Sequence, residues 1–316
     1  MDNNDKVVIH DLNEISFIPV NKLNSLQHLI FGYFFNQPLT NSLDILTSLQ
    51  YLTFGYSFNK PLCNSLDKLS SLQYLTFDYS FNQPLSNSLD NLTLLQQLTF
   101  SNYFNQPLSN SLDKLTSLQH LTFGYWFNQP LSNSLDKLTL LQCLTFGFCF
   151  NQPLCNSLDK LTCLQHLTFG YEFNQPLCNS LDKLTCLQYL TFGKNFNQLL
   201  SNSLVKLTSL QRLTLGFCFN QPLDLPSNIK YLDLDCNNQI LIDNLHDNIE
   251  KIILGEYFNL ELDNLPSSIK KIIIYNNDYD KELNNLPSSV EYIHLPLAYK
   301  KKILNKPKSL KKIKYN

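Results

Sequence analysis

Three histidines are the residues of this chain best suited to acid–base or metal chemistry, because imidazole can transfer a proton near neutral pH and can bind zinc. His28, His120 and His166 each follow a Leu-Gln pair, so they share one position of a repeated motif. His120 and His166 lie two repeats apart, which is about 10 Å on a ladder of strands spaced ~4.7 Å. The ligands of one zinc ion lie at about 2.0–2.1 Å from it. We therefore expect these histidines to hold no metal, and we expect no cofactor.

Sequence motifs for nucleophilic catalysis and for phosphate binding are absent. The chain contains no Gly-x-Ser-x-Gly, no phosphate-binding glycine loop with its lysine, and no His-Glu-x-x-His. A catalytic site in a repeat protein would interrupt the repeats with an insertion of new polar residues, and residues 26–223 contain none. We therefore predict that the protein is not an enzyme. An enzyme with an unrecognised site is the less favoured alternative.

The nine cysteines follow the repeats rather than forming a separate pattern. Cys63, Cys155 and Cys178 occupy a position that is Ser or Thr in the other repeats, and Cys163 and Cys186 occupy another serine position. Cysteine is close to serine in size, so the substitution requires no pairing. These residues are predicted to be reduced structural thiols, with disulfide or metal-binding roles as the less favoured alternatives.

A different set of side chains is suited to binding a protein. The motif Leu-Gln-x-Leu-Thr-Phe varies at its third residue, while its Gln and Thr are nearly constant. Alternation along a strand places the third residue and the Thr on one outward side. Aromatic residues and arginine, which anchor many interfaces, occur there and at the second position after the following glycine. Neutral drift after recent duplication is the alternative explanation for this variation. The predicted partner-binding residues are His28, Tyr51, Tyr74, Gln97, His120, Trp126, His166, Tyr189 and Arg212.

The elements that position these residues are internal repeats. A Phe-Asn pair recurs every 23 residues from Phe35 to Phe219, nine times in all. Beyond it the period shortens to 20 or 21 residues. The chain is therefore divided into an N-terminal cap (1–25), nine 23-residue repeats (26–223), and about five shorter repeats with a basic C-terminal cap (224–316). The predicted starts of the strand segments in the shorter repeats are Ile229, Ile249, Ile269, Val290 and Leu310.

One repeat predicts one turn of a solenoid. The apolar residues of Leu-x-x-Leu-x-Phe alternate as in a strand of about six residues with one buried face. Such a strand must stack on its copies, which gives a parallel β-ladder on the concave face. The Phe and Leu of Phe-Asn-Gln-Pro-Leu are expected to point inward, and the following Leu-x-x-Leu to close the convex face as a loop, 3₁₀ or short helical turn. The predicted fold class is therefore a repeat solenoid.

Two further residue types have a fixed place in the repeat. All eight glycines directly follow the strand motif, which indicates an unusual φ or a close approach of the neighbouring backbone. The asparagine of Phe-Asn recurs in all nine long repeats. A buried asparagine ladder can satisfy backbone groups where the chain turns, and we favour that structural role over binding.

The segment FNQPLSNSLDKLTSLQ-x-LTFG resembles the FNIP repeat, a leucine-rich-repeat-like family of amoebae and of large viruses that infect them. The resemblance is strong over residues 26–223 and weaker over 224–316. It implies a curved leucine-rich-repeat-like solenoid that takes part in protein interactions, with no catalytic residues to transfer. Relatives often carry an N-terminal F-box, for which the 25 residues before the first repeat are too few, so we infer no role in a ubiquitin ligase.

Charge and hydropathy limit the partners and the compartment. The net charge is −2, and no signal peptide or long apolar run is present. We expect an intracellular, cytoplasmic protein (in the host cytoplasm if viral) that binds a protein partner and neither membrane nor nucleic acid. Residues Lys300–Lys314 hold eight lysines and no acid, which is consistent either with a polar end cap or with a targeting or anion-binding segment. A self-associating structural protein is the alternative function.

Overall fold

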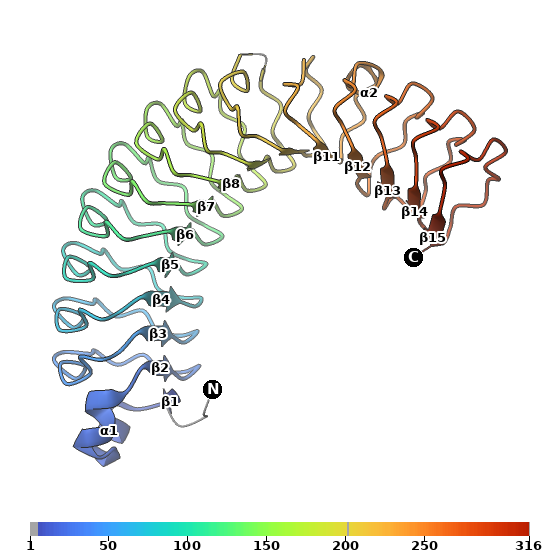
Figure 1. The fold of residues 1–316 in the computed structure, drawn as a ribbon. Coiled ribbons are helices and arrows are strands. Elements are labelled where there is room, and N and C mark those ends of the chain that lie inside the picture. The colour runs from blue at the N-terminus through green and yellow to red at the C-terminus, as the bar shows by residue number, and fades with distance from the viewer. Residues whose placement is uncertain (1–5, 201, 316) are drawn as a thin grey trace. The chain divides into compact units, whose positions relative to one another are not determined.

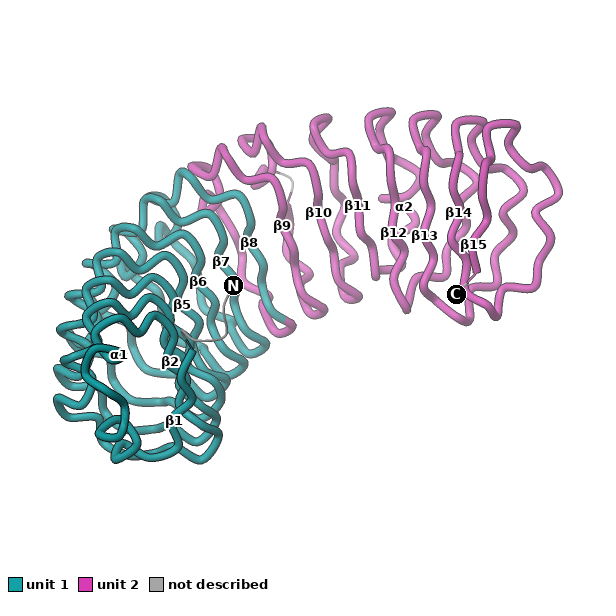
Figure 2. Tube along the Cα trace, turned by 60° about the horizontal axis from the view of Figure 1, so that its bottom comes forward, with its two compact units in different colours: residues 1–170 teal, residues 171–316 magenta. Residues whose placement is uncertain are grey.

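The computed structural model describes residues 6–200 and 202–315 and confirms the predicted fold class. The chain is a parallel β-solenoid with few helices (Figure 1). It divides into two compact units, Met1–Gly170 (unit 1) and Tyr171–Asn316 (unit 2), which Figure 2 shows in different colours. Within each unit, every strand pairs in parallel with the next strand along the chain.

The elements of unit 1 are a short N-terminal strand, two short helices and seven repeat strands. They are β1 (Lys6–Ile9), the 3₁₀ helix η1 (Leu12–Phe17), α1 (Val20–Ser25), β2 (His28–Phe31), β3 (Tyr51–Phe54), β4 (Tyr74–Phe77), β5 (Gln97–Thr99), β6 (His120–Thr122), β7 (Cys143–Thr145) and β8 (His166–Thr168).

The elements of unit 2 are seven strands and one helix. They are β9 (Tyr189–Thr191), β10 (Arg212–Leu215), β11 (Tyr231–Leu234), α2 (Gln239–Asp243), β12 (Lys251–Leu254), β13 (Lys271–Ile274), β14 (Tyr292–Leu295) and β15 (Lys312–Tyr315).

The strands are shorter than predicted, with three or four residues instead of about six. The first two residues of each motif precede the strand, although the second still makes hydrogen bonds to the next repeat. The carbonyl of Gln27, for example, accepts hydrogen bonds from both Gln50 and Tyr51 of the next repeat, at 2.9 Å each. In the shorter repeats the strands accordingly begin two residues after the predicted starts, at Tyr231 instead of Ile229 for the first of them.

The core is built from apolar columns that run through each stack. Leu52, Phe54, Phe58 and Leu62, from one repeat, are at most 1% exposed, as the inward positions of the motif predict. Opposite the strands, the chain turns through successive hydrogen bonds from residue i+3 to residue i, such as Leu46 N–H to the Leu43 carbonyl. This 3₁₀-type pattern fits the predicted convex face.

The glycine column is explained by close packing and not by an unusual φ. No glycine has a positive φ. A Cβ built on Gly147 would instead overlap the carbonyl oxygen of Gly124, because the turns of neighbouring repeats touch at this point. The positive φ angles lie elsewhere, at the residue after Pro-Leu, which the sequence pattern did not reveal. These residues are Thr40, Cys63, Ser86, Ser109, Ser132, Cys155 and Cys178, with φ of 46–47°.

The left-handed backbone conformation at this position leads to a prediction about stability. Ser109 has φ 46°, a backbone conformation that costs free energy in residues with a Cβ atom but not in glycine. We expect Ser109→Gly to raise the free energy of unfolding by roughly 0.5–1 kcal/mol, after subtraction of glycine's greater freedom in the unfolded chain. The control is Asn110→Gly at the neighbouring exposed residue, which should lower stability. Urea denaturation followed by circular dichroism checks both variants. An equal loss of unfolding free energy in the two variants would show that Ser109 is not strained.

The predicted asparagine ladder is present. The Oδ1 of Asn36 accepts a hydrogen bond from the backbone N–H of Asn59 at 2.9 Å, and Asn59 does the same for Asn82. The Nε2 of Gln83 donates to the same Asn59 oxygen at 2.9 Å. These asparagines are half-buried rather than fully buried along most of the ladder. Their structural role is confirmed, because each satisfies a backbone group at the turn of the next repeat.

Candidate interaction surface

The outward side of the strands is the surface on which most of the predicted binding residues lie; we call it the strand face. In β3, Leu52 and Phe54 are buried, whereas Tyr51 and Thr53 are partly exposed. The same alternation holds in the other repeat strands of unit 1. The prediction that the third and fifth residues of the motif share the outward side is therefore confirmed.

In unit 1 five of the predicted residues, from His28 to His120, form a continuous row. His28, Tyr51 and Tyr74 stack, with ring centroids 4.0 and 4.4 Å apart and interplanar angles of 6° and 4°. The register continues through Gln97 to His120 on the next two strands. Burial and the neighbouring Tyr74 raise the pKa of Tyr51 above its ordinary value. The row thus presents ring edges and hydroxyl groups in fixed positions.

A second aromatic row lies one residue after the glycine column and was missed from the sequence. Tyr33, Tyr56 and Tyr79 stack at 4.5 and 4.3 Å. Further along the chain, Tyr125 stacks on Phe148 at 4.6 Å. An aromatic residue recurs directly after the glycine in the sequence, and this recurrence is the signal that could have predicted the row. The prediction used only the next, more variable position.

The remaining predicted residues of unit 1 are less closely gathered. Trp126 is 48% exposed and lies against Tyr125 edge-on, with ring centroids 4.9 Å apart, outside the strands. His166 lies on β8, two strands from His120. Burial and the nearby His120 lower the pKa of His166. Within the described part of the chain, no three His, Cys, Asp or Glu residues are gathered as a metal site requires.

In unit 2 the strand face carries charge. The guanidinium of Arg212 lies between the rings of Tyr189 and Tyr231, 5.9 and 5.4 Å from their centroids. The carboxylate of Asp233 is 4.0 Å from the Arg212 Nε and takes the place of the usual threonine. Burial raises the pKa of Asp233 more than the neighbouring Arg212 and Lys251 lower it. The fold therefore disfavours the charged form of this carboxyl group, which costs stability wherever the group is ionised.

Replacing Asp233 with threonine, the residue found at this position in β10, should stabilise the protein at neutral pH by up to about 1 kcal/mol. A carboxyl group whose pKa rises on folding loses its proton first in the unfolded chain, so its cost is present above the folded-state pKa. The advantage of Asp233→Thr should therefore shrink as the pH falls toward about 4. Urea denaturation across this range checks it, and a variant less stable than the parent at neutral pH would refute it.

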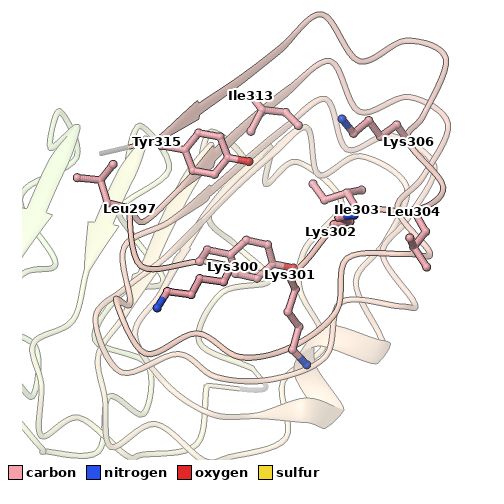
Figure 3. A pocket seen from close by; sticks show the side chains of 10 residues that line it. Leu297, Lys300, Lys301, Lys302, Ile303, Leu304, Lys306, Ile313 and Tyr315 are labelled. Carbon is pink, nitrogen blue, oxygen red and sulfur yellow. The ribbon is translucent and has the colours of Figure 1, made fainter.

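The basic C-terminal segment lies around the last strand of unit 2. Lys311 pairs with Glu291 at 2.7 Å, whereas Lys300 and Lys306 line a hollow of about 510 Å³ together with the apolar Ile303 and Ile313 (Figure 3). Cationic and apolar groups are thus mixed at this end of the unit. Whether the segment acts as a cap or as a targeting signal stays a prediction.

In the part of the chain that the structure describes, every helix is too short or too polar to span a bilayer. The cytoplasmic location stays a prediction.

Short parallel strands, in-register apolar columns and a varied strand face define a repeat solenoid of the leucine-rich-repeat class. The family model for a leucine-rich repeat region matches residues 56–236, more than half of the chain. The chain therefore belongs to the leucine-rich-repeat family. The FNIP repeat model matches residues 219–257 and 258–298. The resemblance to FNIP repeats is thus confirmed, and the matches fall mainly in the shorter repeats, where the motif is weaker by inspection.

Several solved structures are similar to this chain, and the internalin and Toll–Spätzle structures, with TM-scores above 0.5, support the same fold. CroV588, a circular leucine-rich-repeat protein from a giant virus, is 27% identical, with 92% of this chain and 56% of CroV588 covered and a TM-score of 0.49. An internalin, InlF of Listeria monocytogenes, is 17% identical, with coverage of 86% and 81% and a TM-score of 0.61. A chain of the Drosophila Toll–Spätzle complex is 15% identical, with coverage of 92% and 49% and a TM-score of 0.65.

These comparisons identify the fold of the chain and do not identify an activity. The chain spans only about half the length of CroV588 and of the Toll–Spätzle chain. No curated protein matches it in sequence. Leucine-rich-repeat folds are typical of protein–protein interaction scaffolds, and these repeat families are generally not enzymes.

Proposed function

We propose that the protein is a non-enzymatic scaffold that binds a protein partner through its strand face. The observation that carries the proposal is the pair of aromatic rows in unit 1, which begin with His28, Tyr51 and Tyr74 and with Tyr33 and Tyr56. The proposed partner-binding residues are His28, Tyr51, Tyr74, Gln97, His120, Trp126, His166, Tyr189 and Arg212.

The physical state of these rings supports binding. The rings of Tyr51 and Tyr74 stack face to face, so their side chains are ordered before a partner arrives and lose little freedom on binding. Both remain partly exposed, and their hydroxyl groups can donate or accept hydrogen bonds. Rigid aromatic side chains with a polar tip are common at the centres of protein interfaces.

A matched pair of variants tests the proposal in the native cell. Tyr51→Ser combined with Tyr74→Ser removes the strand-face rings. Leu94→Ser combined with Leu140→Ser removes two exposed apolar residues from the segment before the strands, with 53% and 51% exposure. We expect the amount of partner recovered with the tagged tyrosine variant to fall at least about tenfold, because the variant lacks interface anchors. The tagged leucine variant should recover as much partner as the unaltered protein.

The opposite pattern would reject the proposal, provided that circular dichroism shows both variants to be folded. Self-association is the alternative function, and size-exclusion chromatography separates it. A concentration-dependent oligomer that the Tyr51/Tyr74 variant leaves intact would favour a structural protein over a scaffold for other proteins.

A further inference from the structure

In unit 2 the outward third position of the strands forms a row of cations and tyrosines. Register pairs Arg212 with Tyr231, Tyr231 with Lys251, and Lys251 with Lys271. The pairing continues through Tyr292 of β14 to Lys312 of β15. Figure 2 shows strands β10 to β15 following one another along the unit. We call these six residues the basic row; it contains four cations and no carboxylate: Arg212, Tyr231, Lys251, Lys271, Tyr292 and Lys312.

The preceding position in the same repeats shows a different arrangement. There, lysine alternates with glutamate and the charges are paired: Lys270 with Glu250 at 3.1 Å, and Lys311 with Glu291 at 2.7 Å. Lys230 also lies 3.9 Å from Glu250. These pairs neutralise their own charges, so this neighbouring row offers little net attraction to an anion.

The cations of the basic row lack such partners. Among the ion pairs of the described residues, none involves Lys251, Lys271 or Lys312, and Arg212 has only Asp233 at 4.0 Å. Burial and the positive charges of Arg212 and Lys271 lower the pKa of Lys251, although Asp233 opposes this. Like charges are thus crowded along the row, and an anionic ligand would relieve their repulsion.

Buried polar atoms on the same face also lack hydrogen-bond partners. In the described part of the chain, three buried side-chain atoms have none: the Arg212 Nε, the Asp233 Oδ1 and the His294 Nε2. All three belong to outward positions of β10, β11 and β14. A buried polar group without a partner costs free energy, so a ligand whose groups reached these three atoms would gain hydrogen bonds that the protein itself does not make.

We propose that the basic row binds an extended acidic segment of a partner protein, which enters across β10 to β14. The proposal rests on the scaffold function and specifies the chemistry of the partner. Carboxylates of the segment contact Lys251 and Lys271, and small side-chain rotations bring its backbone carbonyl and N–H groups to Arg212 and Asp233. The distance across these strands is about 19 Å at ~4.7 Å per strand, which about six extended residues cover.

A peptide fits this face better than a nucleic acid does. The rings of Tyr189 and Tyr231 already flank the guanidinium of Arg212, which occupies the faces on which a base would stack. The carboxylate of Asp233 lies beside the row and repels phosphates, whereas a peptide N–H can donate to it. Only a ligand with both hydrogen-bond donors and acceptors matches the unpartnered atoms of this face.

Fluorescence anisotropy of the full chain with a labelled peptide of alternating glutamate and serine tests the proposal. Its controls are the same peptide with glutamine for glutamate and a labelled oligothymidylate. The test variant is Lys251→Gln with Lys271→Gln. The matched control is Lys230→Gln with Lys270→Gln, which removes the same charge from the ion-paired row. We expect the test variant to bind the acidic peptide at least about tenfold more weakly, and the control to change it less than about threefold.

Three results would overturn the proposal: no saturable binding of the acidic peptide by the unaltered chain, equal weakening in both double variants, or tighter binding of the oligothymidylate than of the peptide. The scaffold function would survive each of these results, because it is tested separately by partner recovery with the Tyr51/Tyr74 variant of unit 1.

Discussion

Phe127→Ala is expected to lower the free energy of unfolding by about 4 kcal/mol, because it removes a whole aromatic ring from the core. Phe127 is fully buried, and its ring stacks on Phe123 at 4.0 Å and lies 6.1 Å from Phe150. The same column continues through Phe104 at 6.1 Å, so the lost ring leaves a cavity between repeats that close-packed neighbours cannot fill.

The control for this prediction is the adjacent residue. Trp126 is 48% exposed, so Trp126→Ala removes a larger side chain from the surface and should change stability by less than about 0.5 kcal/mol. Urea denaturation followed by circular dichroism measures both variants. A larger loss for Trp126→Ala than for Phe127→Ala would show that the inward and outward positions have been assigned the wrong way round.

Gly147→Ala should have the second-largest effect, a loss of about 2 kcal/mol from a single added methyl group. The added Cβ would overlap the carbonyl of Gly124, and Gly170 approaches Gly147 in the same way from the other side. Backbone atoms cannot rotate aside, so the two turns must separate and loosen the phenylalanine column beside them.

The chain already contains an example of that separation. Asp78 and Ser101 occupy the glycine position in two consecutive repeats, where the rings of Phe77 and Phe100 are 6.5 Å apart. The corresponding distance is 5.1 Å in the pair before, between Phe54 and Phe77, and 5.4 Å in the pair after. The wider spacing coincides with Ser101, whereas the Phe54–Phe77 pair, in which Asp78 replaces glycine opposite Gly55, is not widened.

Asp78→Gly is the matched control for Gly147→Ala. Asp78 is exposed and occupies the glycine position without widening the Phe54–Phe77 spacing, so this reverse change should alter stability by less than about 0.5 kcal/mol. Thermal and urea unfolding of the two variants provide the comparison. A Gly147→Ala variant as stable as the parent would mean that the close approach of the turns is not what keeps glycine in this column.

Much of the fold could be predicted because aligning the repeats with one another shows which positions are constant and which vary. The fixed place of Phe58, Asn59 and Leu62 in each copy determined which residues point inward and which form the hydrogen-bonded ladder. Alternation in the strand motif placed Tyr51 and Tyr74 on the outward side before their stacking was known. Periodicity carries this information because inward positions tolerate few side chains and outward positions tolerate many.

Other features depend on contacts that a pattern does not encode. The left-handed φ of Ser109 falls on a residue type with no preference for that conformation, so nothing in its identity signals it. The Tyr33 row repeats with little variation, and a uniform position is as consistent with a structural role as with a binding role, so uniformity alone does not mark a binding surface. The partial burial of Asp233 and its 4.0 Å approach to Arg212 depend on contacts between neighbouring strands, which the pattern of one strand does not encode.

The binding role of the strand face is tested most directly by photo-crosslinking in the native cell. A benzophenone amino acid would replace Tyr74 on the strand face or, in a separate protein, Leu94 on the segment before the next strand. Leu94 is exposed and Tyr74 is partly exposed, and the two sites lie on different sides of the repeat. Binding through the strand face predicts a discrete adduct with another protein from position 74 and none from position 94. An adduct from position 94 with none from position 74 would contradict it.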